Sequence, residues 1–392
     1  MKKEIRESQA HSENLFIPYA LPFIEEEDIL AVGEAMRSNW LTTGPRTKAF
    51  EREFSVFIGA NHSIALNSCT AGLHLLLKAA GVGPGDEVVL PDMTFCATAN
   101  TVIHVGARPV FADIDEVSLD LTAKTIEPCL SERTKVVMPV HYAGNPCQMD
   151  EIKDLARRKG LVVIEDAAHA VGTYYRGKHV GAENASFSFY ATKNLTTGEG
   201  GLVSCLPEWE DRIRTLALHG LSRDAYKRYE KGGKWFYEVA EPGFKYNMTD
   251  MQAALGLVQL GKLERMQEKR ESIAARYNRA FGEIEGLILP PVSGGEGDRH
   301  AWHLYLLRIN EKILPMGRDG FIEGLTEAGI GISLHFIPLH RHPAYEFLGY
   351  RNADFPVCEK TFSRILSLPL YPGLKEENIE RVIAAVREIA RR

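Results

Sequence analysis

The stretch "SFSFYATKNLTTGEGG", residues 186–201, brings one lysine, Lys193, to the end of a strand-like segment. Apolar and polar residues alternate before the lysine, and "GGLVSC" (200–205) starts a second strand-like segment after it. Between the two stand Gly198, Gly200 and Gly201. Glycine has no Cβ, so the backbone can pass here where a side chain would collide. The stretch therefore predicts two strands that display one cation at a glycine-rich turn.

The segments before this stretch alternate between strands and helices. Short continuous apolar runs such as "DEVVLP" (86–91) and "LVVIEDAA" (161–168) predict strands, whereas "TAGLHLLLKAAG" (70–81) and "DEIKDLARRKG" (150–160) have helical spacing. Continuous apolar runs are typical of strands buried on both faces of a parallel sheet. The alternation predicts an α/β fold in which helices flank a doubly wound, mostly parallel sheet.

We expect three parts along the chain: a polar N-terminal arm (1–16), a large domain (17–255), and a connecting helix with a smaller α+β domain (256–392). A long helix is predicted over 249–283 and a loop over 289–298. In the last part, strands are predicted over 303–309 and 331–336, and helices over 318–330 and 378–392.

Composition narrows the class of protein. The chain of 392 residues has 45% hydrophobic residues and a net charge of −6, which gives no reason to expect nucleic acid or an anionic membrane as a partner. Its first residues lack the apolar core of a signal peptide, and no apolar run approaches the ~18 residues of a membrane span. Six cysteines without a CxxC pair favour a reduced, cytoplasmic protein. No GxGxxG follows the first strand, so a Rossmann dehydrogenase is poorly supported.

Two charged residues stand at the ends of predicted strands, where α/β sheets bind their ligands. Asp166 ends the strand in "VVIEDAAHA", and Lys193 ends another. Pyridoxal phosphate (PLP) chemistry uses both types of residue, because a lysine forms a Schiff base with the aldehyde and a carboxylate pairs with the protonated ring nitrogen. A structural ion pair is the alternative for these two residues.

Further residues suggest a phosphate and a flat ring. Ser68, Cys69 and Thr70 precede a predicted helix, whose N-terminus can cradle an anion, although an ordinary N-cap is the simpler interpretation. Phe95 follows another strand and could stack on a cofactor ring or belong to the core. Ser188 could add a phosphate contact or be a polar strand residue.

The order of short motifs resembles a known family. "TTGP", "NSCTAGLHLLL", "PDMTFCATAN", "EDAAHAVG", "SFSFYATKN", "GEGG" and "KYNMTDMQAALG" follow one another as in the DegT/StrS-type nucleotide-sugar aminotransferases. These are aspartate-aminotransferase-like PLP enzymes of fold type I, and the resemblance runs from about residue 17 to the C-terminus. It implies a seven-stranded-type sheet in the large domain.

The resemblance also implies roles at the cofactor. Lys193 would be the Schiff-base lysine and the acid and base of proton transfer, and Asp166 the partner of the ring nitrogen. His169 stands where relatives carry His or Gln near the 3-oxygen of the ring. Phe95 would stack on the ring, and the phosphate would be held by Ser68, Cys69, Thr70 and Ser188.

A partner chain is implied as well. Asn247 of "KYNMTD" would reach the phosphate of the neighbouring subunit's cofactor, which implies a homodimer with shared active sites.

The sugar end of the site is predicted from three segments. Thr43 and Gly44 follow a helix with a turn and are expected to meet the sugar. The long basic and aromatic segment 219–239 is either a functional loop or a solvated one, and in the first case it contributes Arg223, Tyr229 and Lys231.

"SLHFIPLHRHPAY" holds three histidines. The matching family segment contacts the sugar nucleotide, so His335 is expected at the substrate, with a structural role as its alternative, and His340 is expected in a structural role. No metal is expected, because no acidic or cysteine partner stands at ligand spacing in this segment.

The predicted function is a ping-pong transamination. Glutamate would donate its amino group to PLP, and a UDP-linked 4-keto-6-deoxyhexose would accept it at carbon 4, giving an amino sugar for a glycan such as lipopolysaccharide. A 3-keto acceptor, TDP- or GDP-linked sugars, and a carbocycle such as an inosose stay open. A non-catalytic regulatory protein of the PLP fold is the alternative from another class.

Overall fold

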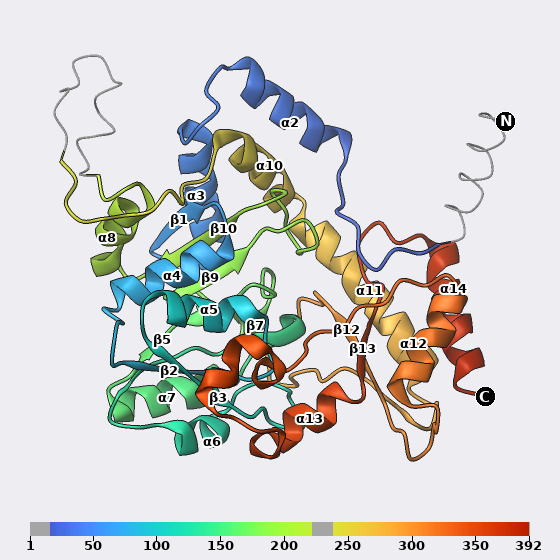
Figure 1. Ribbon diagram of the computed structural model, residues 1–392. Coiled ribbons are helices and arrows are strands. Elements are labelled where there is room, and N and C mark those ends of the chain that lie inside the picture. Colours follow the sequence, from blue (N-terminus) through green and yellow to red (C-terminus); the bar gives the residue numbers. More distant parts are fainter. Residues whose placement is uncertain (1–15, 222–237, 392) are drawn as a thin grey trace.

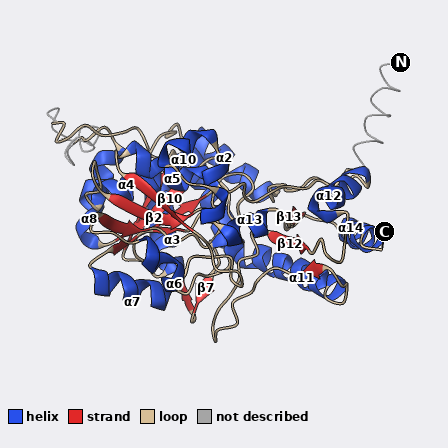
Figure 2. Cartoon of the chain, turned by 60° about the horizontal axis from the view of Figure 1, so that its bottom comes forward, coloured by secondary structure: helices blue, strands red, loops and turns tan. Residues whose placement is uncertain are grey.

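The computed structural model describes residues 16–221 and 238–391, and its strands are covered by helices on both faces (Figures 1 and 2). One four-stranded sheet has the order β3 (Arg108–Ala112), β2 (Glu87–Pro91), β4 (Thr134–Val137), β5 (Val162–Val163), and all its pairs are parallel. The predicted α/β class is confirmed.

The second sheet has the order β1 (His62–Leu66), β10 (Gly201–Cys205), β9 (Ala185–Ser188), β6 (Glu165–Asp166). Its β6–β9 pair is parallel and its other two pairs are antiparallel. Only Ile164 separates β5 from β6, and Val140 forms a parallel bridge to Asp166, so the two sheets meet at this strand. These eight strands are thus divided between two sheets, and the seven-stranded layout stays a prediction.

Two hydrophobic cores cover the two faces of these sheets. Alternate residues of β2 divide between them, since Val88 and Leu90 join one core and Val89 the other. Helices α4 (Cys69–Ala79), α5 (Cys96–His104) and α8 (Pro207–Ala217) contribute to the first core, and α3 (Pro45–Ile58) and α7 (Met149–Lys159) to the second. The short helix α6 (Ala123–Ile126) joins the second core.

The predicted long helix over 249–283 is wrong in one respect, because it is two helices. They are α10 (Asp250–Gly261) and α11 (Leu263–Phe281), and Lys262 between them has φ −107° and ψ 7°. The Lys262 ammonium is buried and pairs with Asp28 of α2 (Glu26–Arg37) and, at 3.2 Å, with Glu25. Lys262 is the single residue between the two helices.

A third sheet lies beside α11, in the order β11 (Leu287–Ile288), β12 (Tyr305–Ile309), β13 (Ile365–Leu368). It packs with α12 (Gly317–Glu327) and α14 (Glu376–Ile389) around a third core. The strand predicted over 331–336 is wrong, because Ser333 forms only an isolated bridge to Ser367 of the unpredicted strand β13. His335 and Phe336, which follow in this segment, line a cavity instead.

The remaining elements are a hairpin, β7 (Tyr174–Tyr175) with β8 (Lys178–His179), and the helix α13 (Pro356–Phe362). Short 3-10 turns occupy 127–129, 142–144, 339–341, 343–348 and 352–354. The division into domains at 255/256 stays a prediction, and the predicted N-terminal arm (1–16) lies almost wholly outside the described residues. Within the described part of the chain, no helix is both long enough and apolar enough to span a membrane.

Candidate active site

A cavity of about 440 Å³ opens beside the ends of β6 and β9. Its lining includes nine of the residues predicted from the sequence: Ser68, Cys69, Thr70, Phe95, Asp166, His169, Ser188, Lys193 and His335. Side chains separated by as many as 267 positions therefore meet in one place. The volume falls within the range of about 300–1,000 Å³ that is usual for small-molecule sites.

Lys193 follows β9 and extends its amine into this cavity. Burial lowers the pKa of its amine from 10.5 to about 8, although Cys69 and Asp166 oppose the change. Its Nζ lies 3.3 Å from Nε2 of His303. At pH 7 roughly a tenth of such an amine is neutral, compared with less than a thousandth for an ordinary lysine. The site thus favours a lysine that can act as a nucleophile or a base.

Asp166 ends β6 on the cavity side and is buried. The Thr98 hydroxyl donates to its Oδ2 at 2.9 Å, and the Ala168 N–H donates to its Oδ1 at 3.1 Å. Burial raises the pKa of this carboxyl, while these two bonds and the charge of Lys193 act against the rise. A cation placed against the carboxylate would offset its desolvation.

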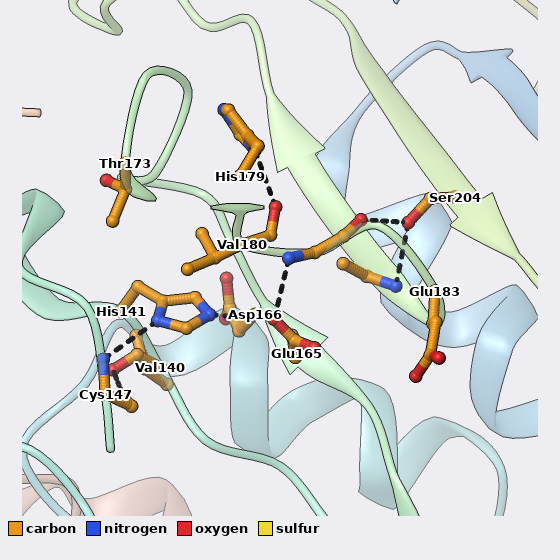
Figure 3. A network of polar contacts seen from close by, with 12 residues as sticks. Val140, His141, Cys147, Glu165, Asp166, Thr173, His179, Val180, Glu183 and Ser204 are labelled. Atoms are coloured by element: carbon orange, nitrogen blue, oxygen red, sulfur yellow. Dashed lines mark hydrogen bonds and ion pairs between the residues drawn. The ribbon is translucent and has the colours of Figure 1, made fainter. Parts of the chain in front are cut away.

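Glu165, the residue before Asp166, points to the opposite side of the strand into a second polar network (Figure 3). The Cys147 N–H donates to His141 Nδ1 at 3.1 Å, so the His141 proton lies on Nε2 and is donated to Glu165 Oε2 at 3.0 Å. Burial would raise the pKa of Glu165, but the hydrogen bond from His141, the charge of Lys153 and the hydrogen bond from the Gly181 N–H outweigh it and lower that pKa. The network anchors the strand that carries Asp166.

His169 lies near the lysine with its tautomer fixed by the backbone. The Ala143 N–H donates to His169 Nδ1 at 3.3 Å, so the ring proton lies on Nε2. Burial, with the nearby Lys193 and His335, holds the pKa of His169 well below its usual value. His169 therefore presents a neutral ring that can donate one hydrogen bond.

The N-terminus of α4 forms one end of the cavity. Ser68 Oγ accepts from the Ala71 N–H at 3.1 Å, so the ordinary N-cap interpretation of Ser68 is confirmed. The first N–H groups of a helix have no acceptor within the helix, and those of Cys69 and Thr70 remain for an anion. A Cβ on Gly201 would lie 2.3 Å from the Ser68 carbonyl carbon, so only glycine lets β10 approach this turn so closely. That contact explains the glycine at position 201.

The aromatic wall of the cavity consists of Phe95 and Phe336, whose ring centroids are 5.9 Å apart. Phe95 is 56% exposed, so the alternative of a core phenylalanine is wrong. An exposed ring at a cavity wall can stack on a flat ligand.

Thr43, Gly44 and Asn247 lie outside this cavity lining and beside one another. Asn247 Nδ2 donates to Thr43 Oγ1 at 2.7 Å, and this hydroxyl donates to the Met248 carbonyl at 2.6 Å. Gly44 is the N-cap of α3, where a Cβ would lie 2.0 Å from Trp40 Nε1. The chain by itself does not bring these three residues to the lysine. Three further predicted substrate residues lie outside the described residues: Arg223, Tyr229 and Lys231.

His335 and His340, both from the segment "SLHFIPLHRHPAY", lie in different surroundings. His335 lines the cavity, its Nδ1 lies 2.9 Å from Ser367 Oγ, and burial together with Lys193 lowers its pKa to about 4. His340 is buried between Asp92 at 2.7 Å and Glu359 at 3.1 Å, two acids that sequence spacing could not reveal. Over residues 16–221 and 238–391, no three His, Cys, Asp or Glu side chains are grouped so as to hold a metal ion.

Sequence reasoning missed several residues of the lining. Some, such as Phe336 beside His335, flank predicted residues in the chain and could have been found by proximity, but His303 follows no motif that the sequence offered. The missed residues with functional side chains are Tyr19, Tyr190, Thr192, Glu199, His303 and Phe336.

The site as a whole fits PLP. It offers a buried amine of lowered pKa, a buried carboxylate that needs a cation, a helix N-terminus for a phosphate and an exposed aromatic ring. These features define a PLP-dependent enzyme of the α/β class. The chain belongs to the DegT/DnrJ/EryC1/StrS aminotransferase family, whose model matches residues 22–387.

Relatives support the family and the cofactor. The chain is 51% identical over 383 residues to the spore coat polysaccharide biosynthesis protein SpsC of Bacillus subtilis, covering 96% of this chain and 98% of SpsC. The putative sugar aminotransferase Spr1654 of Streptococcus pneumoniae has a TM-score of 0.89 and 33% identity, covering 96% of this chain and 99% of Spr1654. It has been solved in PMP and PLP forms, so the predicted cofactor is confirmed.

Helicobacter pylori PseC, an aminotransferase involved in the biosynthesis of pseudoaminic acid, has a TM-score of 0.88 and 28% identity over 96% of this chain and 99% of PseC. The predicted aminotransferase class is therefore supported by sugar aminotransferases over nearly the whole chain.

Proposed function

We propose that this protein transfers an amino group from glutamate to a nucleotide-linked keto sugar at the cavity around Lys193. The observation that carries the proposal is the buried Lys193 amine, with a pKa of about 8, in one cavity with the buried carboxylate of Asp166. PLP bound there supplies an aldehyde that takes up the amino group and a ring that accepts an electron pair.

In this proposal Lys193 holds the cofactor and, when its amine is free, takes a proton at Nζ from the amino donor and returns it. A neutral amine is needed for that step, and the lowered pKa supplies it near neutral pH. Asp166 keeps the ring nitrogen protonated, because its buried carboxylate is stabilised by a cation. Thr98 and Ala168 orient the carboxylate through their hydrogen bonds.

The other predicted cofactor residues bind and orient. The first N–H groups of α4, at Cys69 and Thr70, would hold the phosphate together with Ser68 and Ser188. His169 would donate its Nε2 proton to the 3-oxygen of the ring, and Phe95 would cover one face of it. His335, which lines the same cavity as Lys193, would meet the sugar.

The acceptor proposed is a UDP-linked 4-keto-6-deoxyhexose, aminated at carbon 4. Support comes from the motif resemblance and from relatives, since SpsC is described in polysaccharide biosynthesis and PseC in pseudoaminic acid biosynthesis. The product would enter a surface glycan. A 3-keto acceptor would be distinguished by the carbon that carries the new amino group. An inosose-type carbocycle would be distinguished by activity that does not depend on a nucleotide.

We further propose a homodimer that shares its active sites. Helix α2 exposes Ile29, Leu30 and Met36, which are 58%, 52% and 57% exposed, and Trp40 just beyond it is 50% exposed. Apolar side chains gathered on one helix mark a surface that a partner covers. Asn247 and Thr43 lie nearby and outside the cavity, as a residue serving the partner's site would. A molar mass of one chain by light scattering would contradict the dimer.

The first experiment is the visible absorption spectrum of the purified protein with PLP, before and after adding glutamate. A band that bleaches with glutamate supports the cofactor role of Lys193 and the first half-reaction, and a panel of UDP-, TDP- and GDP-linked keto sugars then identifies the acceptor. A PLP band that glutamate leaves unchanged points to another donor or a regulatory protein. If Lys193→Ala keeps a near-normal turnover, the role of Lys193 is wrong.

A further inference from the structure

His303 faces the amine of Lys193 and has no role in the reaction as described so far. Its Nε2 lies 3.3 Å from Lys193 Nζ, and it lines the same cavity. The residue comes from the segment before β12, 110 positions after the lysine. It is buried, and its ring centroid lies 4.3 Å from that of His169.

Asn194 fixes the position of the proton on His303. Asn194 Nδ2 donates to the Ala301 carbonyl at 2.6 Å, so the other end of this amide, Oδ1, faces His303 Nδ1 at 3.2 Å. A carbonyl oxygen only accepts, so Nδ1 carries the proton and Nε2 keeps its lone pair. The residue next to the lysine therefore turns an acceptor toward the lysine.

The residue before His303, Trp302, has a strained backbone conformation, and several hydrogen bonds hold this segment in place. Trp302 has φ 48° and Ala143, which faces it, has φ 58°. The Ala143 carbonyl accepts from the N–H groups of His303 and Leu304 at 3.0 and 3.2 Å. The Trp302 carbonyl accepts from Arg270 Nη1 at 3.2 Å. Such strain persists where the surroundings over-determine it, and it clusters at active sites.

Burial and the nearby charges keep the His303 ring neutral, so its Nε2 can accept a hydrogen bond. Burial, the charge of Lys193, and then His169, Arg270 and His335 hold the pKa of His303 well below its usual value. Its imidazole is therefore neutral across the physiological range and cannot repel the lysine as a second cation.

We propose that His303 is a positioning residue for Lys193, whose Nε2 lone pair accepts one N–H of the free lysine amine while Asn194 fixes the His303 tautomer. No proton is transferred in this contact. Because this hydrogen bond fixes the direction of one N–H, it also sets the direction in which the other N–H and the lone pair of the Lys193 amine point within the cavity. The proposal rests on the function of Lys193 proposed above, because only a lysine that works as a free amine needs such alignment.

Two substitutions separate this role from a purely structural one. In His303→Asn the shorter amide can still donate a hydrogen bond to Asn194 Oδ1, as His303 Nδ1 does. It places no acceptor near Lys193, where His303 Nε2 lies in the unaltered protein. His303→Gln does the reverse, because its amide reaches toward Lys193 and gives up the contact with Asn194. The control is His300→Asn. His300 is a buried imidazole of the same segment, but it lies outside the cavity lining. In the unaltered protein the Trp302 N–H donates to His300 Nδ1 at 2.8 Å, and the shorter amide of asparagine can still accept this hydrogen bond.

The first readout uses protein without cofactor. The rate at which a small acylating reagent labels Lys193 is followed against pH by mass spectrometry of the peptide that contains it. We expect the midpoint of His303→Asn to fall by about one pH unit, because the charged amine loses an acceptor. His303→Gln and the His300→Asn control should keep the midpoint of the unaltered protein.

The second readout is the rate of the glutamate half-reaction in the PLP-loaded protein. We expect His303→Asn to lower the limiting rate constant of this half-reaction about ten- to a hundredfold, with little change in the glutamate concentration that gives half of that rate, and His303→Gln to recover most of the loss. The reverse order of the two variants in both readouts would overturn the proposal, since it would show that His303 only anchors Asn194. If glutamate has no effect on the unaltered protein, the proposed function fails, whereas the labelling experiment still decides the His303–Lys193 contact.

A measurement on the unaltered chain covers the case in which a variant does not fold. ¹⁵N NMR of histidine-labelled protein should show His303 Nδ1 protonated and Nε2 unprotonated at neutral pH. A proton on Nε2 would overturn the proposal.

Discussion

Replacing Lys193 with methionine should stabilise the cofactor-free protein at neutral pH. Burial lowers the pKa of this amine from 10.5 to about 8, so the folded protein holds the proton less tightly than the unfolded chain. A shift of about 2.5 units at ~1.4 kcal/mol per unit corresponds to roughly 3 kcal/mol of the free energy of unfolding. Methionine keeps an unbranched apolar stem without the charge, so the variant avoids this cost.

The sign of the effect fixes its pH window. Between pH 10.5 and about 8 the unfolded chain binds a proton that the folded protein does not, so the stability of the unaltered protein falls as the pH falls through this range. Below pH 8 the full cost remains. The advantage of Lys193→Met should therefore be largest below pH 8, shrink between pH 8 and 10.5, and vanish above that range.

Urea unfolding of both proteins after removal of PLP, at pH 7 and in steps up to about 10.5, measures this difference. Lys153→Met is the matched control, because Glu165 and Glu183 outweigh burial and raise the pKa of Lys153. That variant should lose stability at pH 7. If Lys193→Met gains nothing at pH 7, or gains the same at every pH, the Lys193 ammonium is not desolvated as the structure implies.

Four further results are expected. Asp166→Asn should keep the fold but lower kcat by about a hundredfold or more, because the ring nitrogen loses its charged partner; steady-state kinetics with saturating PLP test this. Gly201→Ala should weaken PLP binding, measured by fluorescence titration, because its Cβ would collide with the backbone of Ser68. His340→Ala should cost about 3 kcal/mol by removing the imidazole that pairs with buried Asp92, which then keeps only the backbone N–H of residue 340. Burial would lower the pKa of His340, but the hydrogen bond and charge of Asp92 and the charge of Glu359 outweigh it and raise that pKa above 6.5. The loss should therefore be complete below pH 6.5 and shrink as the pH rises through the folded value. Extensive chelation should leave activity intact; a loss that only zinc restores would contradict the metal-free site.

Much of the α/β part of the fold followed from local patterns. Continuous apolar runs located β2 and the β5–β6 strand, because strands buried on both faces need apolar side chains on both. Strand ends then pointed to Asp166 and Lys193, since parallel topology brings such ends together. The division at Lys262 escaped prediction: Gly261 before it is a poor helix former, but the pairing of Lys262 with Asp28 is a long-range contact that no local pattern contains.

The C-terminal side of the site was harder to predict. The segment 331–336 alternates like a strand, but only Ser333 forms a bridge to β13. His335 and Phe336 belong to the cavity wall instead. His303 was missed because its place depends on a strained backbone and on hydrogen bonds to residues far away in the sequence. The roles given to Thr43, Gly44 and Asn247 stay predictions, since they depend on a second chain.

The contact of Gly201 with the backbone of Ser68 also bears on how the protein is made. The phosphate-binding turn is complete only when β10 has docked against α4, which requires a stretch of more than 130 residues to be synthesised first. His303 and Phe336, which close the cavity, emerge from the ribosome later still. At synthesis rates of about 5–20 residues per second, the nascent chain spends many seconds with an unfinished pocket. We therefore expect PLP to bind after these segments have been synthesised.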